Sequence, residues 1–227
     1  GSQAEVVIEA RRAASLVGAT PMDRPEDIEV NKVTNTVFVA LTKNSRRSAE
    51  NVDAANPRIR NRHGHVMEIV PANGTDHAAT SSRWSLLLLA GDPADAATKA
   101  QYHPGVSSKG WLSNPDNFTV DPKGRLWIST DGANDFGYAD GLWATDVVGQ
   151  GRALTKHFFS CPVGGELTGP TFTPDGTTLF CSVQHPGDTG DDSSFVTPAT
   201  RWPDFKDGIP PRPSVIAIRT TSGKPIG

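Results

Sequence analysis

The sequence lacks long apolar runs and any marked excess of charge. Its longest apolar run, LLLLAG at 86–91, is the size of a strand, whereas a helix that crosses a bilayer needs roughly 20 apolar residues. The formal net charge is only −3 over 227 residues, so the chain offers no basic field for nucleic acid. These absences argue against a transmembrane helix and against a nucleic-acid partner.

Cysteine is also scarce, and the common catalytic motifs are missing. Cys161 and Cys181 match no zinc-binding spacing. A disulfide between them is possible, but two buried free thiols are the favoured state. The sequence contains neither the G-x-S-x-G elbow of serine hydrolases nor the H-E-x-x-H motif of zinc proteases. Both of these chemistries are therefore disfavoured.

Turn-forming residues are plentiful. The chain has 22 glycines and 18 prolines, and only 36% of its residues are hydrophobic, which favours an all-β protein with many turns. One short helix is expected at 8–19, with Ile8, Leu16 and Val17 on an apolar stripe and Gly18 at its end. Residues 1–2, Gly-Ser, resemble a cloning remnant. We therefore expect residues 1–227 to be a single fragment of a longer protein.

Three segments share one pattern of strand, turn and strand, and they begin at Arg24, Asn114 and Leu167. The predicted turns lie at 31–35, 121–124 and 173–176. Two of these turns contain Asp-Pro-Lys-Gly and Pro-Asp-Gly, in which proline presets one dihedral angle and glycine accepts a positive φ. Each segment is therefore predicted to be a β-hairpin.

Further strand-like segments follow each hairpin. They lie at 64–70 and 83–91, at 141–148 and 153–160, and at 214–220. The strands therefore group as four, four and three, and tandem four-stranded antiparallel units are typical of a β-propeller. The predicted fold is a partial β-propeller of about three four-stranded blades. Such an open arc exposes sheet edges, so it either self-associates or is completed by the rest of a longer protein.

The candidate site residues stand where successive inner strands begin. Glu26, Asp116 and Thr168 occupy equivalent positions, and Glu166 lies two residues before Thr168. Carboxylates that converge from successive blades suit calcium, and they could also bind iron or manganese. Arg24 adds a planar guanidinium, which matches phosphate or carboxylate.

Each of these residues also has a simpler interpretation. Any one of the acids could cap a turn, and Arg24 could pair with a neighbouring aspartate. Asn117 could bind a metal or form a local Asx turn, and Asp131 is expected in a tight turn. His63 and His65 form a weak candidate metal pair with no third ligand nearby.

Four stretches, in this order, resemble the PhoX-type calcium-dependent alkaline phosphatases of bacteria. They are GATPMDRPEDIEV, NPRIRNRHGHVMEI, NPDNFTVDPKGRLWISTDG and GGELTGPTFTPDGTTLFCSVQHPGD. The resemblance extends from about residue 5 to residue 220 and corresponds to the C-terminal part of the family's proteins. It implies half of a six-bladed propeller, exported to the periplasm, that hydrolyses phosphate monoesters with calcium and iron.

The resemblance also implies roles for individual residues. Arg24 and Glu26 match the R-P-E motif, in which the arginine would bind substrate phosphate and the glutamate a metal. Glu166 would be a second metal ligand, and Asp116 and Asn117 match a motif whose role is open between metal and substrate. Asp27 stands where the family usually has an aromatic residue. The family's other metal ligands belong to the N-terminal half, so an isolated fragment is expected to be inactive.

Two other readings stay open at the level of the sequence. A lactonase-type propeller also binds calcium through residues from successive blades, and the segment that begins at Asn114 would fit one. A non-catalytic propeller that serves as a binding scaffold is the other, because fold alone does not determine function. The R-P-E arginine and the order of the motifs favour the phosphatase.

Overall fold

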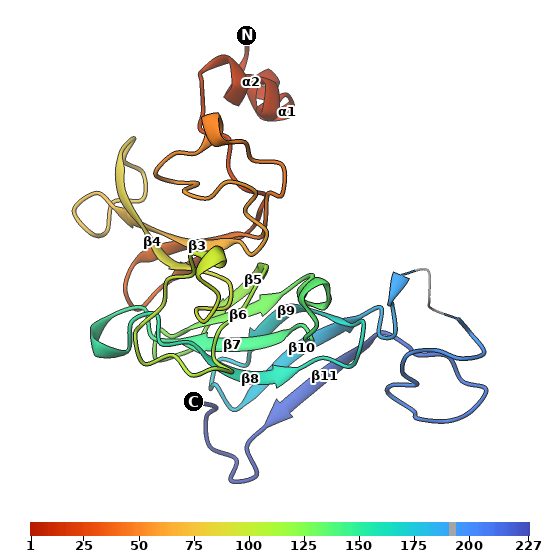
Figure 1. Cartoon of the computed structure of the whole chain (residues 1–227). Helices are drawn as coiled ribbons and strands as arrows, with labels where there is room; N and C mark the ends of the chain where they lie inside the picture. Colours follow the sequence, from red (N-terminus) through yellow and green to blue (C-terminus); the bar gives the residue numbers. More distant parts are fainter. Residues whose placement is uncertain (191–193) are drawn as a thin grey trace.

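The computed structural model describes residues 1–190 and 194–227, and in these residues three antiparallel β-sheets follow one another along the chain (Figure 1). The first sheet has the strand order β1-β2-β3-β4. Its strands are β1 (Pro25–Asn31), β2 (Thr36–Leu41), β3 (His65–Pro71) and β4 (Ser82–Leu89). The Asn31 Oδ1 accepts hydrogen bonds from the N–H groups of Val33 (3.0 Å) and Thr34 (3.2 Å), which forms the turn predicted at 31–35.

The second sheet repeats this arrangement in the order β5-β6-β7-β8. Its strands are β5 (Pro115–Val120), β6 (Leu126–Thr130), β7 (Gly141–Thr145) and β8 (Lys156–Ser160). In the predicted turn at 121–124, Gly124 has φ +82°, a backbone conformation that side chains other than hydrogen disfavour. The Asp121 carboxylate accepts from the N–H groups of Lys123 and Arg125 and so holds the turn.

The third sheet has β10 at its centre, in the order β11-β10-β9. Its strands are β9 (Glu166–Phe172), β10 (Thr178–Gln184) and β11 (Ser214–Arg219). The predicted all-β fold and the grouping of strands as four, four and three are thus confirmed in the described residues.

The sheets pack on one another through two apolar clusters. The cluster between the first and second sheets includes Phe38, Val66 and Ile128. The cluster between the second and third sheets includes Trp127 and Leu179, together with Cys161 and Cys181, which are both buried free thiols as expected. The first strands of the sheets also meet, because β5 contacts both β1 and β9. One surface of the molecule is therefore built from β1, β5 and β9.

The N-terminal helix differs from the prediction. Two short helices, α1 (Gln3–Ile8) and α2 (Ala10–Leu16), replace the single helix expected at 8–19. A capping box between Ser2 and Glu5 starts α1 earlier than the apolar pattern indicated. No residue of either helix is buried, so the stripe of Ile8, Leu16 and Val17 does not join the core. Gly18, with φ +69°, follows the end of α2 as predicted.

The remaining helical segments are single 3₁₀ turns. They are η1 (Ala49–Asn51), η2 (Ala96–Thr98), η3 (Ala133–Phe136) and η4 (Gly149–Gly151). Within the described ranges, no helix has the length and apolar character that a membrane span requires.

Candidate active site

The sequence-predicted site residues lie at or near the starts of β1, β5 and β9. Arg24 and Glu26 flank the first residue of β1, Asp116 and Asn117 belong to β5, and Glu166 opens β9. Because β5 contacts both β1 and β9, residues far apart in the sequence come together on one surface. The charges of Glu26, Asp116 and Asp131 act on the Arg24 guanidinium, and that of Glu166 acts on Asp116. We call these four carboxylates the acidic cluster.

Arg24 holds an unusual position in this cluster. Its backbone has φ +51°, a left-handed conformation that is uncommon for residues other than glycine. Its Nε donates to the Glu26 Oε1, and its Nη2 donates to the Asp131 Oδ2 at 3.4 Å. The side chain is still 45% exposed. Burial lowers its pKa, but the hydrogen bond to Glu26 and the charges of Glu26, Asp131 and Asp116 outweigh burial and raise it.

Asp116 is the most perturbed acid of the cluster. The residue is 6% exposed, and its pKa rises to about 7. Burial is the largest cause, and the negative charges of Asp131, Glu166 and Glu26 add to it, whereas Arg24 acts in the opposite direction. The cluster therefore holds more negative charge than its own guanidinium balances.

Glu166 is held at both of its carboxylate oxygens. The Gln184 Nε2 donates to Oε1 at 2.9 Å, and the His185 Nε2 lies 3.1 Å from Oε2. Burial raises the Glu166 pKa, Asp131 adds to the rise, and His185 opposes it. These contacts fix the direction in which the Glu166 carboxylate faces.

His185 contacts an acceptor oxygen with each ring nitrogen in this arrangement. Its Nδ1 lies 3.0 Å from the Gly164 carbonyl oxygen, which can only accept, and its Nε2 faces a carboxylate. Burial lowers the His185 pKa, but these two contacts and the charge of Glu166 raise it more. The backbone at His185 is strained, with φ +33°. When it is protonated, His185 adds a second positive charge beside the acidic cluster.

Asn117 connects two sheets. Its Oδ1 accepts a hydrogen bond from the Thr168 hydroxyl at 2.6 Å and another from the Gly169 N–H at 3.2 Å. The side-chain oxygen therefore links β5 to β9 and supports the geometry of the cluster. A role for Asn117 toward metal or substrate stays a prediction.

Two members of the site were not predicted from the sequence. Asp131 was expected only to form a turn, but its carboxylate contacts Arg24 across 107 residues of chain. The sequence analysis did not single out His185, but the register of β9 with β10 places Gln184 opposite Glu166, and His185 is the next residue. The predicted hairpin turn at 173–176 was a signal that these two segments meet, but a register shift between Phe180 and Ser182 decides which residues pair.

His63 and His65 do not form the weakly predicted metal pair. The His65 ring lies in the core, with its Nε2 2.8 Å from the Ala55 carbonyl oxygen and its Nδ1 3.1 Å from the Asn61 amide nitrogen. The His63 Nδ1 instead lies 2.9 Å from the Ser113 hydroxyl. The two imidazole rings therefore contact different neighbours.

The acidic cluster offers the donors that hard cations prefer. Carboxylate oxygens suit calcium, and neighbouring negative charges add to the burial that raises the Asp116 pKa. Among the described residues, however, no group of three or more His, Cys, Asp or Glu is arranged to hold one ion. The chain thus presents donors of the right chemistry without a complete ligand set.

Comparisons with known proteins agree with the resemblance in the sequence. The family model described as alkaline phosphatase PhoX matches residues 1–187. A solved structure, Pseudomonas fluorescens PhoX in complex with vanadate, a transition state analogue, superposes with a TM-score of 0.83 at 33% sequence identity. The match covers 100% of this chain and 38% of that chain. No curated protein matches the sequence.

Proposed function

The chain belongs to the PhoX alkaline phosphatase family, and we propose that the protein of which it forms part hydrolyses phosphate monoesters at a site that includes the acidic cluster. The observation that carries the proposal is the half-exposed guanidinium of Arg24, set in an acidic cluster that it does not neutralise. A structural relative was solved with vanadate, a transition state analogue, and such a ligand suits a phosphoryl-transfer site.

Arg24 is the proposed phosphate-binding residue. Its Nε and Nη2 are held by Glu26 and Asp131, and among the described residues its Nη1 has no hydrogen-bond partner. The guanidinium is therefore oriented by two acids while one nitrogen remains open to a substrate oxygen. A positioned cation of this kind stabilises charge on a phosphoryl group during transfer.

Glu26 and Glu166 are the proposed metal ligands, and Asp116 is a third candidate. Gln184 and His185 orient Glu166, while burial and the neighbouring acids raise the Asp116 pKa, which a bound cation would lower again. Calcium and iron are the metals that the family suggests. Bound there, such cations would neutralise phosphate oxygens and activate an oxygen nucleophile.

The remainder of the site is proposed to come from another part of the protein. The sheets of this chain would form half of a six-bladed propeller, and the missing blades would supply the other metal ligands. Three sheets with adjacent first strands fit this arrangement. On this basis the isolated chain is inactive, and the intact protein works in the periplasm.

The first test is p-nitrophenyl phosphate hydrolysis by the intact protein, with and without a calcium chelator, beside the isolated chain. We expect activity in the intact protein that the chelator abolishes, and none in the isolated chain. A protein that hydrolyses lactones and spares the phosphate ester would overturn the proposal. So would a metal-supplied protein with no hydrolytic activity, which would favour a binding scaffold.

A further inference from the structure

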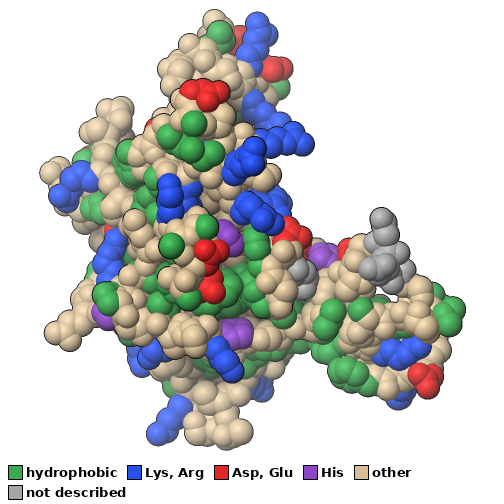
Figure 2. Space-filling view, in the orientation of Figure 1, with side chains coloured by type: hydrophobic (Ala, Val, Ile, Leu, Met, Phe, Trp, Pro, Cys, Tyr) green, Lys and Arg blue, Asp and Glu red, His purple; other side chains and the backbone are tan. Residues whose placement is uncertain are grey.

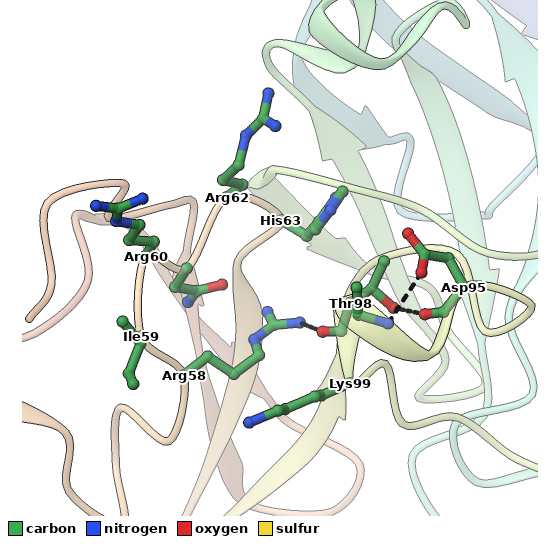
Figure 3. A pocket seen from close by; sticks show the side chains of 10 residues that line it. Arg58, Ile59, Arg60, Arg62, His63, Asp95, Thr98 and Lys99 are labelled. Carbon is green, nitrogen blue, oxygen red and sulfur yellow. Dashed lines mark hydrogen bonds between the residues drawn. The ribbon is translucent and has the colours of Figure 1, made fainter. Parts of the chain in front are cut away.

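A second concave site lies beside the acidic cluster and carries the opposite charge. It is a cavity of about 230 Å³ between the loop at 58–63 and the turn at 95–99 (Figure 3). Four cationic side chains line this basic pocket, namely Arg58, Arg60, Arg62 and Lys99. Figure 3 shows Arg58 at its centre with Lys99 beside it, and Arg60 and Arg62 farther out.

Arg58 is a buried charge with no carboxylate in ion-pair contact among the described residues, although the charge of Asp23 acts on it from farther away. The residue is 5% exposed, and its guanidinium donates to the carbonyl oxygens of Ala90 (2.6 Å), Thr98 (2.9 Å) and Gly64. In the described part of the chain no carboxylate pairs with it, and its Nε has no hydrogen-bond partner. Burial lowers its pKa to about 10, so the side chain stays charged at neutral pH. An uncompensated buried charge costs several kcal/mol, which an anion nearby would offset.

The other cations are exposed and unpaired. None of Arg60, Arg62 and Lys99 forms an ion pair with a described residue, and Arg62 only places its guanidinium carbon 5.0 Å from the centre of the Phe136 ring. In Figure 2, several Lys and Arg side chains lie over the upper part of the molecule, where Figure 1 places the N-terminal helices and the loops of the first sheet.

One carboxylate, that of Asp95, also lines the pocket. Its Oδ1 accepts a hydrogen bond from the Ala97 N–H, and this hydrogen bond caps the start of η2. The positive potential of the pocket reaches His63, whose pKa is lowered to about 4 by burial first and then by Arg58 and Arg62. Positive charge therefore exceeds negative charge on the pocket wall.

The pocket and the candidate active site share a wall. Asn114, two residues before Asp116, donates from its backbone N–H to the His63 carbonyl oxygen (2.7 Å) and from its side chain to the Arg62 carbonyl oxygen (2.9 Å). The Phe136 ring packs near the same residues, with its centre 4.3 Å from the centre of the His63 ring. A group bound in the pocket would thus lie next to the segment that positions Asp116.

We infer that the basic pocket is a second anion site, in which Lys99 and the other cations of its wall bind a phosphate-sized oxyanion beside the buried charge of Arg58. The oxyanion is either a second anionic group of the substrate or free phosphate. Binding of a second anionic group of the substrate rests on the proposed function, whereas binding of free phosphate does not. Either one would add negative charge beside Arg58, which forms no ion pair with a described residue.

The test measures inorganic phosphate binding to the intact protein by calorimetry at low ionic strength. Arg24→Ala is the background, because it removes the phosphate-binding residue of the candidate active site. The double change Arg62→Gln and Lys99→Asn then removes two pocket cations and leaves Arg58 in place. Asparagine suits position 99, where φ is +52°, because it tolerates the left-handed conformation. Arg83→Gln, on β4 and unpaired among the described residues, is the matched control.

We expect the double change to weaken phosphate binding at least tenfold and the control to leave it unchanged. Affinity within twofold of the background protein would overturn the inference. Because binding is measured without turnover, this result is independent of whether the protein hydrolyses phosphate esters.

A kinetic measurement distinguishes the two sources of the oxyanion. In protein with Arg24 intact, the double change raises KM for a bisphosphorylated sugar and spares p-nitrophenyl phosphate if the pocket binds a second group of the substrate. If the pocket binds free phosphate, KM for both substrates is unchanged, and inhibition by added phosphate weakens instead.

Discussion

Asp23 and Arg24 are neighbours in the sequence, yet they belong to regions with opposite electrostatic character. Asp23 is 0% exposed, and its carboxylate accepts from the Arg47 Nε and from the Asn61 amide at 2.9 Å. Asn61 also contacts His65. In this buried network of Asp23, Arg47, Asn61 and His65, each charge has a partner of opposite sign. Arg24, by contrast, is half-exposed and faces more carboxylates than it can balance.

The difference separates structural polar groups from functional ones. A balanced, buried network contributes to stability only while it is complete, because the loss of one partner leaves an isolated charge in the core. A partly exposed cluster with excess charge of one sign contributes less to stability, because its ion pairs are in contact with solvent, but it attracts groups of opposite charge. Within the segment 23–26, a residue of the buried network, Asp23, is therefore followed directly by a residue of the candidate active site, Arg24.

The largest expected effect is a loss of stability when the buried network of Asp23, Arg47, Asn61 and His65 is broken. Asp23→Ala leaves the Arg47 guanidinium buried without its carboxylate, and we expect the free energy of unfolding to fall by about 3–5 kcal/mol. Urea-induced unfolding of the chain measures it. Asp131→Ala, which removes an exposed partner of Arg24, is the matched change and should cost less than about 1 kcal/mol. Equal losses would remove the distinction between the two regions.

The next effect falls on activity. Arg24→Ala in the intact protein should lower kcat/KM for p-nitrophenyl phosphate at least about tenfold, equivalent to about 1.4 kcal/mol of transition-state stabilisation. The free energy of unfolding should change by less than about 1 kcal/mol, because exposed ion pairs are weak. Arg46→Ala, an exposed arginine without an ion pair among the described residues, is the control. Unchanged kinetics for Arg24→Ala would count against its role in phosphate binding.

The third effect is a dependence of stability on pH that comes from the buried network. Burial is the main cause that lowers the His65 pKa to about 4, against about 6.5 in an unfolded chain. The unfolded state therefore binds the proton first, and this contribution to stability is complete above about pH 6.5 and decreases as the pH falls toward 4. The full loss is up to about 3 kcal/mol.

Urea unfolding of the wild-type chain and of His65→Gln at several pH values between 4 and 7 tests this expectation. The variant should be less stable at pH 7 and should show a flatter dependence on pH. His77→Gln, on an exposed turn, should keep the wild-type slope. A His65→Gln variant with the same slope as the wild type would show that the dependence arises elsewhere.

The smallest effect concerns the bridge between β5 and β9. Thr168→Val removes the hydroxyl that donates to the Asn117 Oδ1 at 2.6 Å, and we expect a loss of about 1 kcal/mol. A thermal melt should show a small decrease in Tm, and Thr168→Ser, which keeps the hydroxyl, should restore most of it. A serine variant as unstable as the valine variant would assign the effect to packing of the threonine methyl group.

Local patterns explain why so much of the fold was predictable. The turn at 121–124 combines proline, aspartate and glycine, and the observed Asp121 contacts and positive φ of Gly124 follow from these residue types. The N-terminal helix was mispredicted because its apolar stripe has no partner surface, and capping at Ser2 decided where it starts. Short sequence patterns, such as turn motifs, therefore predicted the sheets well. They predicted the N-terminal helices less well, because these helices do not pack against a core.

The sequence by itself determined the hairpins, the three groups of strands, the family, and the candidates Arg24, Glu26, Asp116 and Glu166, because each rests on residues close together in the chain. Only the tertiary structure decided which charges meet. The contact of Arg24 with Asp131 joins residues 107 positions apart. The Arg58 guanidinium donates to the carbonyl oxygens of Ala90 and Thr98, which lie 32 and 40 residues farther along the chain. Electrostatic balance depends on distance and burial in space, and separation along the chain specifies neither.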